Sequence, residues 1–156
     1  MRAKDLHSDG TYAKATITNN SKNVISELME DISLTDGIDK DKLHTTVIYS
    51  TKPCPNIMEV NNTSIPFNGT VTELKSWKNS DGTYCLVAVI DCADLVKLHY
   101  DLLEKYKATD DFPEYIPHIT LCYSYDGKKI KLPDNDYAIK YAKLEVSALE
   151  SDWNAS

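Results

Sequence analysis

Two histidines in this chain are each followed, two residues later, by a threonine, within a seven-residue pattern that occurs twice. The pattern, His-x-Thr-apolar-x-Tyr-Ser, begins at His44 and again at His118. Both copies are rich in β-branched and apolar residues, which favours a strand. Because side chains alternate between the two faces of a strand, Thr46 shares a face with His44, and Thr120 shares a face with His118. If the two strands lie across a cleft, one substrate meets two imidazoles and two hydroxyls.

Two imidazoles and two hydroxyls are suited to breaking a phosphodiester bond. The reaction needs a base for the attacking oxygen and an acid for the leaving oxygen, and histidine, which titrates near neutrality, can serve as either. Threonine hydroxyls can donate hydrogen bonds to the nonbridging phosphate oxygens as negative charge builds up. No carboxylate cluster at metal-ligand spacing accompanies the pattern, which favours a reaction without metal or cofactor. The alternative, both histidines as metal ligands, leaves the two threonines without a role.

The elements around the two motifs are also repeated, over residues 10–50 and 82–124. Each repeat opens on Gly-Thr-Tyr and continues with a predicted strand, a helix, a loop and the His-x-Thr strand. This order indicates an internal duplication within a single domain spanning residues 1–156. The length is sufficient for a substantial hydrophobic core.

Hydrophobic periodicity and capping residues locate the elements. Residues 51–64 have the composition of a surface loop, and Asn79–Gly82 is a hairpin signal. Strict alternation places Tyr49 and Tyr123 opposite the histidines, in the core, and gives residues 138–148 a core face of Ala138, Lys140, Ala142, Leu144, Val146 and Ala148. The predicted strands are 12–18, 65–77, 84–90 and 138–148, and the predicted helices run from Asn20 or Ser21 to about Ser33 and from Asp91 or Asp94 to about Lys107.

Charge and composition exclude several classes of protein. A net charge of −7 argues against binding of duplex nucleic acid, although local donors can still hold one or two phosphates. The N-terminus lacks an apolar signal region and no run is long enough to span a membrane, so we expect a soluble cytoplasmic protein. The densest lysines (Lys128, Lys129 and Lys131) are interpreted as a solvated loop, and the cysteines (Cys54, Cys85, Cys92 and Cys122) as free thiols in a reducing cytosol, with structural zinc as the less favoured alternative.

Together these features resemble the two-histidine (2H) phosphoesterases. The motifs His44-Thr45-Thr46-Val47 and His118-Ile119-Thr120-Leu121 match that family, and the resemblance covers nearly the whole chain. It implies an α+β fold, a duplicated bilobal domain in which two antiparallel sheets flank a central cleft with helices outside. Within the superfamily the chain is more similar to the anti-CBASS phosphodiesterases of tailed phages, through Gly10-Thr11-Tyr12, Asp41-Lys42-Leu43-His44 and Tyr49-Ser50.

The resemblance implies a function and a set of site residues. It implies hydrolysis of the cyclic di- and trinucleotides with which bacteria signal phage infection, in the cytoplasm of the host bacterium if the chain is phage-encoded. Tyr12 and Trp77 match aromatic base contacts, and Glu145, on the polar face of the last strand, could accept hydrogen bonds from a base edge. The catalytic residues carried over are His44, Thr46, His118 and Thr120.

Three other functions remain open at this point. A 2H enzyme acting on linear RNA ends or 2′–5′ oligoadenylate would use the same four residues. A binding module could sequester cyclic nucleotides without cutting them, although two complete motifs argue against this. A structural phage protein with incidental repeats would not bind nucleotides at all.

Overall fold

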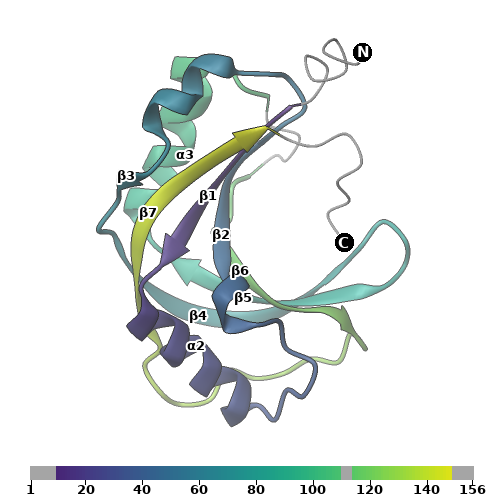
Figure 1. Ribbon diagram of the computed structural model, residues 1–156. Coiled ribbons are helices and arrows are strands. Elements are labelled where there is room, and N and C mark those ends of the chain that lie inside the picture. Colours follow the sequence, from purple (N-terminus) through teal and green to yellow (C-terminus); the bar gives the residue numbers. More distant parts are fainter. Residues whose placement is uncertain (1–9, 110–113, 149–156) are drawn as a thin grey trace.

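The computed structural model describes residues 10–109 and 114–148, which form one curved antiparallel sheet with helices outside it (Figure 1). The strands follow the order β2-β1-β7-β4-β5-β6, and the short β3 pairs with β7. In chain order the elements are β1 (Thr11–Ile17), α2 (Asn19–Asp31), the 3-10 helix η1 (Lys40–Lys42), β2 (His44–Ser50), the 3-10 helix η2 (Pro55–Val60), β3 (Thr63–Ser64), β4 (Asn68–Lys78), β5 (Tyr84–Asp91), α3 (Ala93–Tyr106), β6 (His118–Tyr125) and β7 (Ala138–Ala148).

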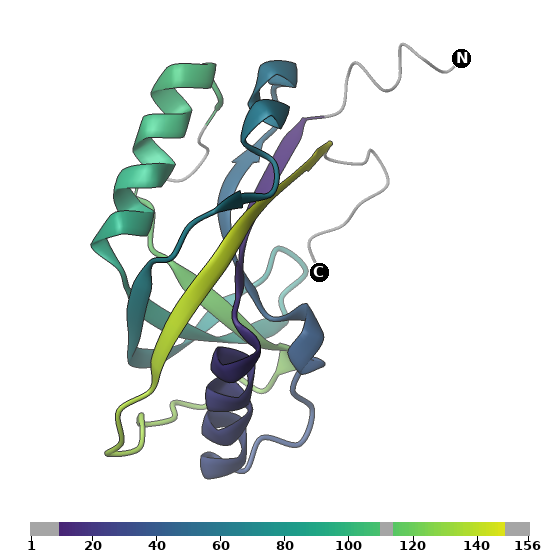
Figure 2. The same ribbon diagram turned by 60° about the vertical axis from the view of Figure 1, so that its left-hand side comes forward.

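Strand β7 joins the two halves of the sheet. It pairs with β1 over most of its length and with β4 through Ala138, Ile139 and Lys140. The two predicted sheets are therefore continuous. Figures 1 and 2 show α2 and α3 at opposite ends of the molecule, on the outside of the bend. The bend brings the two edge strands, β2 and β6, into contact with each other.

Both predicted helices are confirmed, with shifted ends. Helix α2 begins at Asn19 because the Thr18 hydroxyl accepts a hydrogen bond from the Ser21 amide and caps the helix. Helix α3 ends at Tyr106, where Lys107 adopts a left-handed conformation with φ of 57°. Each helix buries one apolar stripe, α2 against β7 and α3 against β2.

The hairpin between β4 and β5 is confirmed as well. The Asn79 amide donates to the Thr83 carbonyl at 2.6 Å, and Gly82 supplies the positive φ of 91° that the turn needs. All four cysteines are free thiols, and three of them are buried.

Two predictions about local structure are wrong in part. Residues 51–64 lie mostly at the surface, as predicted, but they contain η2 and β3 and bury Cys54 and Ile57 in the core. In β7 the register against β1 shifts between Leu144 and Tyr141, so the strand changes faces there. Its buried side chains are consequently Ile139, Tyr141, Leu144 and Val146, while Ala138 and Lys140 are exposed.

Candidate active site

The two His-x-Thr motifs occupy the two edges of the sheet and face each other across its concave side. β2 and β6 are the terminal strands of the sheet order, and the curvature brings them together. His44 lies opposite Thr16 in the register of β1 and β2, and His118 lies opposite Val89 in that of β5 and β6. All four predicted catalytic side chains are only partly buried, and their intervening neighbours point into the core.

His44 is held through both ring nitrogens. Its Nδ1 lies 2.8 Å from the Lys42 carbonyl oxygen, and its Nε2 lies 2.8 Å from the Tyr12 hydroxyl. Because a carbonyl only accepts, Nδ1 is protonated, and the lone pair of the neutral ring is on Nε2. The Tyr12 hydroxyl then donates to Nε2 and accepts from the Thr46 hydroxyl, 3.1 Å away. Tyr12 thus connects the histidine and the threonine of the first motif.

His118 makes the same kind of backbone hydrogen bond as His44. Its Nδ1 donates to the carbonyl of Ile116, 2.9 Å away, so both motifs hold the ring through the carbonyl two residues earlier. On its other side is the indole of Trp77, with ring centroids 4.5 Å apart and planes at 69°. Trp77 reaches this position from β4, where it lies opposite Cys85 of β5.

Burial lowers the pKa of both imidazoles below the ordinary histidine value. For His44, burial is the largest cause and the bond to the Lys42 carbonyl opposes it, while the positive charge of Lys14 lowers the pKa further and the negative charge of Glu145 raises it. For His118, burial again leads, the bond to Ile116 opposes it, and the charge of His44 adds to the lowering. The two rings are therefore close enough for one to influence the protonation of the other.

The three predicted substrate contacts lie on the same concave face as the histidines. Tyr12 and Trp77 each contact one imidazole. Glu145 lies opposite Lys14 in the register of β1 and β7, and its carboxylate approaches the Lys14 ammonium at 3.8 Å. All seven residues predicted from the sequence are thus brought to one surface.

The prediction that Tyr49 and Tyr123 belong to the core is wrong. Tyr49 lies opposite Tyr12, and their rings meet edge to face at 6.5 Å. Tyr123 is 40% exposed. In both motifs the register shifts by one residue directly after the threonine, so two consecutive apolar side chains are buried and the tyrosine returns to the histidine face.

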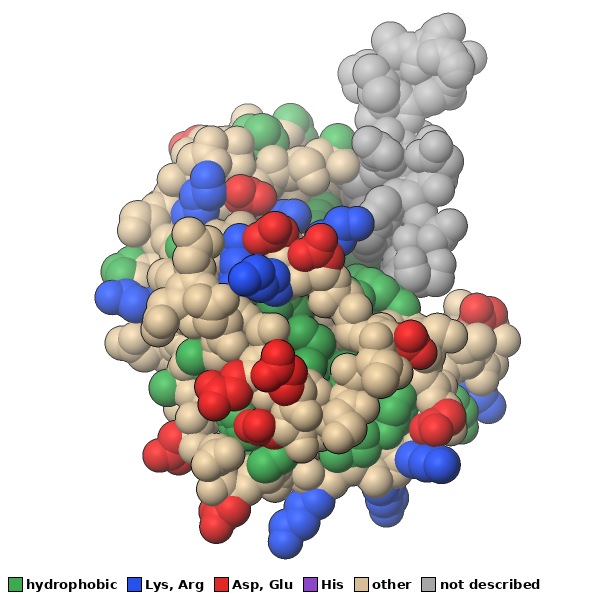
Figure 3. All heavy atoms as spheres, turned by 60° about the horizontal axis from the view of Figure 1, so that its bottom comes forward, with side chains coloured by type: hydrophobic (Ala, Val, Ile, Leu, Met, Phe, Trp, Pro, Cys, Tyr) green, Lys and Arg blue, Asp and Glu red, His purple; other side chains and the backbone are tan. Residues whose placement is uncertain are grey.

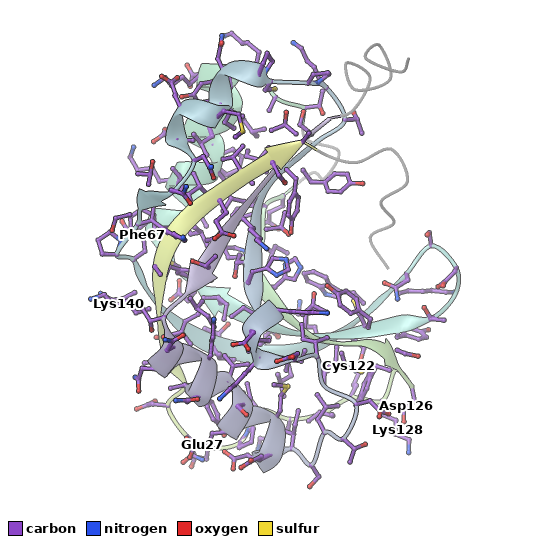
Figure 4. All side chains as sticks on the ribbon, viewed as in Figure 1. Glu27, Phe67, Cys122, Asp126, Lys128 and Lys140 are labelled. Atoms are coloured by element: carbon purple, nitrogen blue, oxygen red, sulfur yellow. The ribbon has the colours of Figure 1, made fainter. Side chains whose placement is uncertain are left out.

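The two bulges have the same pattern of burial. Val47 and Ile48 are buried in the first motif, and Leu121 and Cys122 in the second. Figure 4 shows Cys122 below β6, toward the core, while Lys140 and Phe67 lie on the outer side of the sheet. The repeated tyrosine is therefore a feature of the concave face in both halves of the molecule.

A buried contact behind β2 was not predicted from the sequence. The Tyr115 hydroxyl donates to the Thr46 carbonyl at 2.7 Å, and His99 Nδ1 donates to the Val47 carbonyl at 2.6 Å. The two rings stack with centroids 4.0 Å apart. We call Tyr115 and His99 the clamp. It supplies donors to two carbonyls of the edge strand β2 at the bulge, and it connects the segment before His118 to the strand that carries His44.

Two pockets adjoin the first motif. The larger, about 400 Å³, includes His44, Lys14 and Lys143 in its wall, and the smaller, about 330 Å³, is lined by Tyr12, Asn61, Asn62 and Glu145 among others. Lys14 and Glu145 line both pockets, so a ligand bound beside Tyr12 can extend along β1 and β7 to His44.

Two further features of residues 10–109 and 114–148 concern metals and membranes. Within these ranges no three His, Cys, Asp or Glu side chains are grouped so that they could hold a metal ion. No helix in the same ranges is long and apolar enough to cross a membrane.

The fold is that of the two-histidine phosphoesterases. The crystal structure of E. coli LigT complexed with 3′-AMP superposes with a TM-score of 0.62, covering 90% of this chain and 87% of LigT at 12% sequence identity. This likeness shows the fold, which is the one implied by the resemblance to the 2H phosphoesterases.

The sequence places the chain in one family of that class. Residues 9–156 match the model of the family described as anti-CBASS protein Acb1. The Acb1 of Vibrio phage KVP40 is 36% identical over 121 residues, 78% of this chain and 77% of the relative. That of Enterobacteria phage T4 is 29% identical over 124 residues, 80% of this chain and 78% of the relative. This chain belongs to the Acb1 family of anti-CBASS proteins.

Family and fold together identify a phosphodiesterase that counters CBASS defence. The predicted superfamily, fold class and general function are thereby confirmed.

Proposed function

We propose that the protein hydrolyses cyclic di- and trinucleotide second messengers at its paired histidines, without a metal ion. The observation that supports this most directly is that the backbone orients both imidazoles through the same hydrogen bond. In each motif Nδ1 donates to the backbone two residues earlier, so Nε2 is the nitrogen that can take or give a proton. Two such nitrogens facing one surface meet the need for a base and an acid.

The reaction uses the 2′-hydroxyl of the substrate as nucleophile. One neutral imidazole takes the proton of that hydroxyl, and the oxygen attacks the adjacent 3′–5′ phosphate. The bond from phosphorus to the 5′-oxygen breaks, and the other imidazole, which is protonated, gives its proton to that oxygen. The product carries a 2′,3′-cyclic phosphate, which water can open to a terminal phosphate. Thr46 and Thr120 donate to the nonbridging oxygens while the charge on them is greatest.

The aromatic residues beside the histidines hold the bases. Tyr12 and Trp77 each lie against one imidazole, so a base stacked on either ring places its own phosphate near Nε2. Stacking depends little on which base is present, which suits an enzyme that accepts several cyclic nucleotides. Glu145, in the wall of the smaller pocket, accepts hydrogen bonds from a base edge.

The site of action is the cytoplasm of an infected bacterium. The relatives that match this chain are phage proteins. An enzyme that removes a cyclic nucleotide messenger in that compartment prevents the messenger from activating its effector.

The proposal is tested by incubating the protein with cyclic dinucleotides in the presence of EDTA. We expect cleavage at the rate seen without chelator, through a 2′,3′-cyclic phosphate intermediate detected by chromatography. A cyclic dinucleotide with deoxyribose at every 3′-linked position should resist cleavage. Rapid cleavage of that analogue would exclude the 2′-hydroxyl as nucleophile, and loss of activity in EDTA that is restored by zinc would favour metal ligation by the histidines.

A further inference from the structure

The larger pocket beside His44 has an excess of positive charge in an acidic protein. Its wall contains four lysines and two carboxylates, whereas the whole chain carries a net charge of −7. Figure 3, which brings the lower end of the molecule forward, shows acidic and basic side chains interspersed over that surface. The four lysines are Lys14, Lys22, Lys42 and Lys143, and the carboxylates are Asp41 and Glu145.

The carboxylates position three of these lysines. Glu145 approaches the Lys14 ammonium at 3.8 Å and that of Lys143 at 3.5 Å, and Asp41 approaches that of Lys22 at 3.7 Å. The Lys22 side chain is only 20% exposed. Lysines restrained in this way have less conformational entropy to lose when they bind an anion.

The amino end of α2 adds to this field. Thr18 and Asn19, where the helix starts, line the pocket. The first turn of α2 contains no acidic residue, so the partial positive charge of the helix end is not balanced from within the helix. The lysines and the helix end therefore favour the same kind of ligand, a small anion.

The pocket is continuous with the reaction site, because His44 is part of its wall. Lys14 lies opposite Thr46 in the register of β1 and β2, on the concave face. A cyclic dinucleotide carries two phosphodiesters, both ionised at neutral pH. When one of them lies at the histidines, the second must lie a nucleotide away along the same surface.

We propose that this pocket binds the uncleaved phosphate of a cyclic dinucleotide, through Lys22 and Lys143 together with Lys14 and Lys42. The inference rests on the proposed function for the location of the cleaved phosphate. It makes the second phosphate, in addition to the bases, a determinant of which substrates bind well.

The test compares a substrate with two phosphodiesters and a substrate with one. Cyclic diadenylate and the linear dinucleotide adenylyl-(3′→5′)-adenosine are given to the wild type, the Lys22→Gln/Lys143→Gln variant and a Lys97→Gln/Lys105→Gln control. The control removes the same charge from α3, where Lys97 is 76% exposed. We expect the first variant to raise KM for cyclic diadenylate about tenfold, and to affect the linear dinucleotide much less. The control should match the wild type on both, and Lys22→Arg/Lys143→Arg should restore most of the affinity.

Binding is measured separately from turnover by calorimetry, in a His118→Ala background with cyclic diadenylate. If the wild type cleaves both substrates and the lysine variant loses nothing, or loses equally on both, the phosphate site is wrong and the proposed reaction stands. If the wild type cleaves neither, the proposed reaction is wrong. In that case calorimetry alone decides the phosphate site. Weaker binding of cyclic diadenylate after Lys22→Gln/Lys143→Gln supports the site, and no binding to the His118→Ala protein with both lysines present overturns it.

Discussion

The two His-x-Thr motifs share their backbone arrangement but differ in what surrounds the imidazole. In both, the carbonyl two residues earlier holds Nδ1 and a bulge follows the threonine. At His44 the surroundings are polar, with the Tyr12 hydroxyl on Nε2 and Lys14 near enough to lower the pKa. At His118 the neighbour is the apolar indole of Trp77. The backbone around the two motifs thus determines the orientation of the rings, and side chains outside the seven-residue pattern determine the electrostatics.

This difference favours a division of roles between the two histidines. A hydroxyl that donates to Nε2 of His44 stabilises the neutral ring, and the charge of Lys14 disfavours the protonated ring. The charge of Glu145 opposes that of Lys14, and the charge of His44 lowers the pKa of His118 in turn. Unlike surroundings can separate two like groups into an acid and a base, and the pH dependence of the rate assigns the two roles.

A second difference concerns the support behind each strand. The carbonyls of Thr46 and Val47 are bound by Tyr115 and His99, and Tyr115 lies just before His118 in the chain. The second repeat, residues 82–124, therefore supplies the clamp that holds the first motif. The geometry of one half of the site therefore depends on the other.

The largest expected effect comes from removing either imidazole. Replacing His44 or His118 with alanine should reduce kcat by ~10²–10⁴-fold, because one proton transfer loses its catalyst. Since both act on one transition state, the double variant should be little slower than either single variant. Turnover of cyclic dinucleotides is measured on variants whose folding is checked by circular dichroism. A folded single variant with near wild-type turnover would mean that the paired histidines are not the catalysts.

The next effect separates binding from chemistry. Trp77→Ala and Tyr12→Ala should each weaken nucleotide binding by about 1–3 kcal/mol through lost base stacking. Because the Tyr12 hydroxyl also contacts His44 Nε2, Tyr12→Ala should in addition lower kcat, and Tyr12→Phe should lower kcat with little loss of affinity. Steady-state kinetics and nucleotide binding are measured on the three variants. Equal effects of Tyr12→Ala and Trp77→Ala on kcat would show that the Tyr12 hydroxyl has no special role at His44.

Breaking the clamp should affect the first motif and the stability of the fold together. Tyr115→Phe keeps the stack on His99 but leaves the Thr46 carbonyl without its donor, at a cost of about 1–3 kcal/mol in the free energy of unfolding. We expect kcat to fall and KM to change little, because the carbonyl belongs to the strand that positions His44. Denaturant unfolding and steady-state kinetics measure both. Tyr106→Phe is the control, because it removes an exposed hydroxyl that donates to Glu59 and not to β2. A Tyr115→Phe variant with reduced stability but wild-type kcat would show that the clamp contributes to folding alone.

The sequence predicted that each histidine shares a face with the threonine two residues later, because a strand places residues i and i+2 on one side, and β2 and β6 have this arrangement. The sequence was insufficient for the positions after the threonines. Strict alternation sends Tyr49 and Tyr123 into the core, whereas the bulges return them to the concave face. The available signal was two adjacent apolar residues in each copy, Val47-Ile48 and Leu121-Cys122, which a strand with one buried face does not accommodate without a bulge.

The clamp and the lysine pocket could not be predicted in the same way. Tyr115 and His99 lie on different elements, and their contact with β2 follows from the packing of α3. Similarly, Lys14 and Lys143 are far apart in the chain and meet only through β1 and β7. Local periodicity predicts which face a residue takes, but not which distant residues share that face.

The position of Tyr123 predicts a smaller binding effect. Its ring is exposed on the concave face, on the same half as Trp77, so Tyr123→Ala should weaken nucleotide binding by less than the ~1–3 kcal/mol expected for Trp77→Ala, with kcat unchanged. Calorimetric titration in a His118→Ala background measures the affinity. Tyr106→Ala, which removes a ring at the end of α3, is the matched control. If Tyr123→Ala and Tyr106→Ala had the same affinity, the second bulge would have no role in binding.

The smallest predicted effect is a displacement along the pH axis. Because burial lowers the pKa of both imidazoles, kcat/KM should follow a bell-shaped profile whose optimum lies below the ordinary histidine value. Lys14→Gln removes the positive charge that lowers the pKa of His44, so this pKa should rise. If His44 is the base, the acidic limb, where the base becomes protonated, should then move to higher pH. If His44 is the acid, the alkaline limb should move to higher pH instead. NMR titration of the His44 imidazole gives the same quantity without substrate. Lys97→Gln is the control, since Lys97 pairs with Asp101 on α3 and is not among the groups that shift His44. A Lys14→Gln profile in which neither limb moves would exclude His44 from both roles.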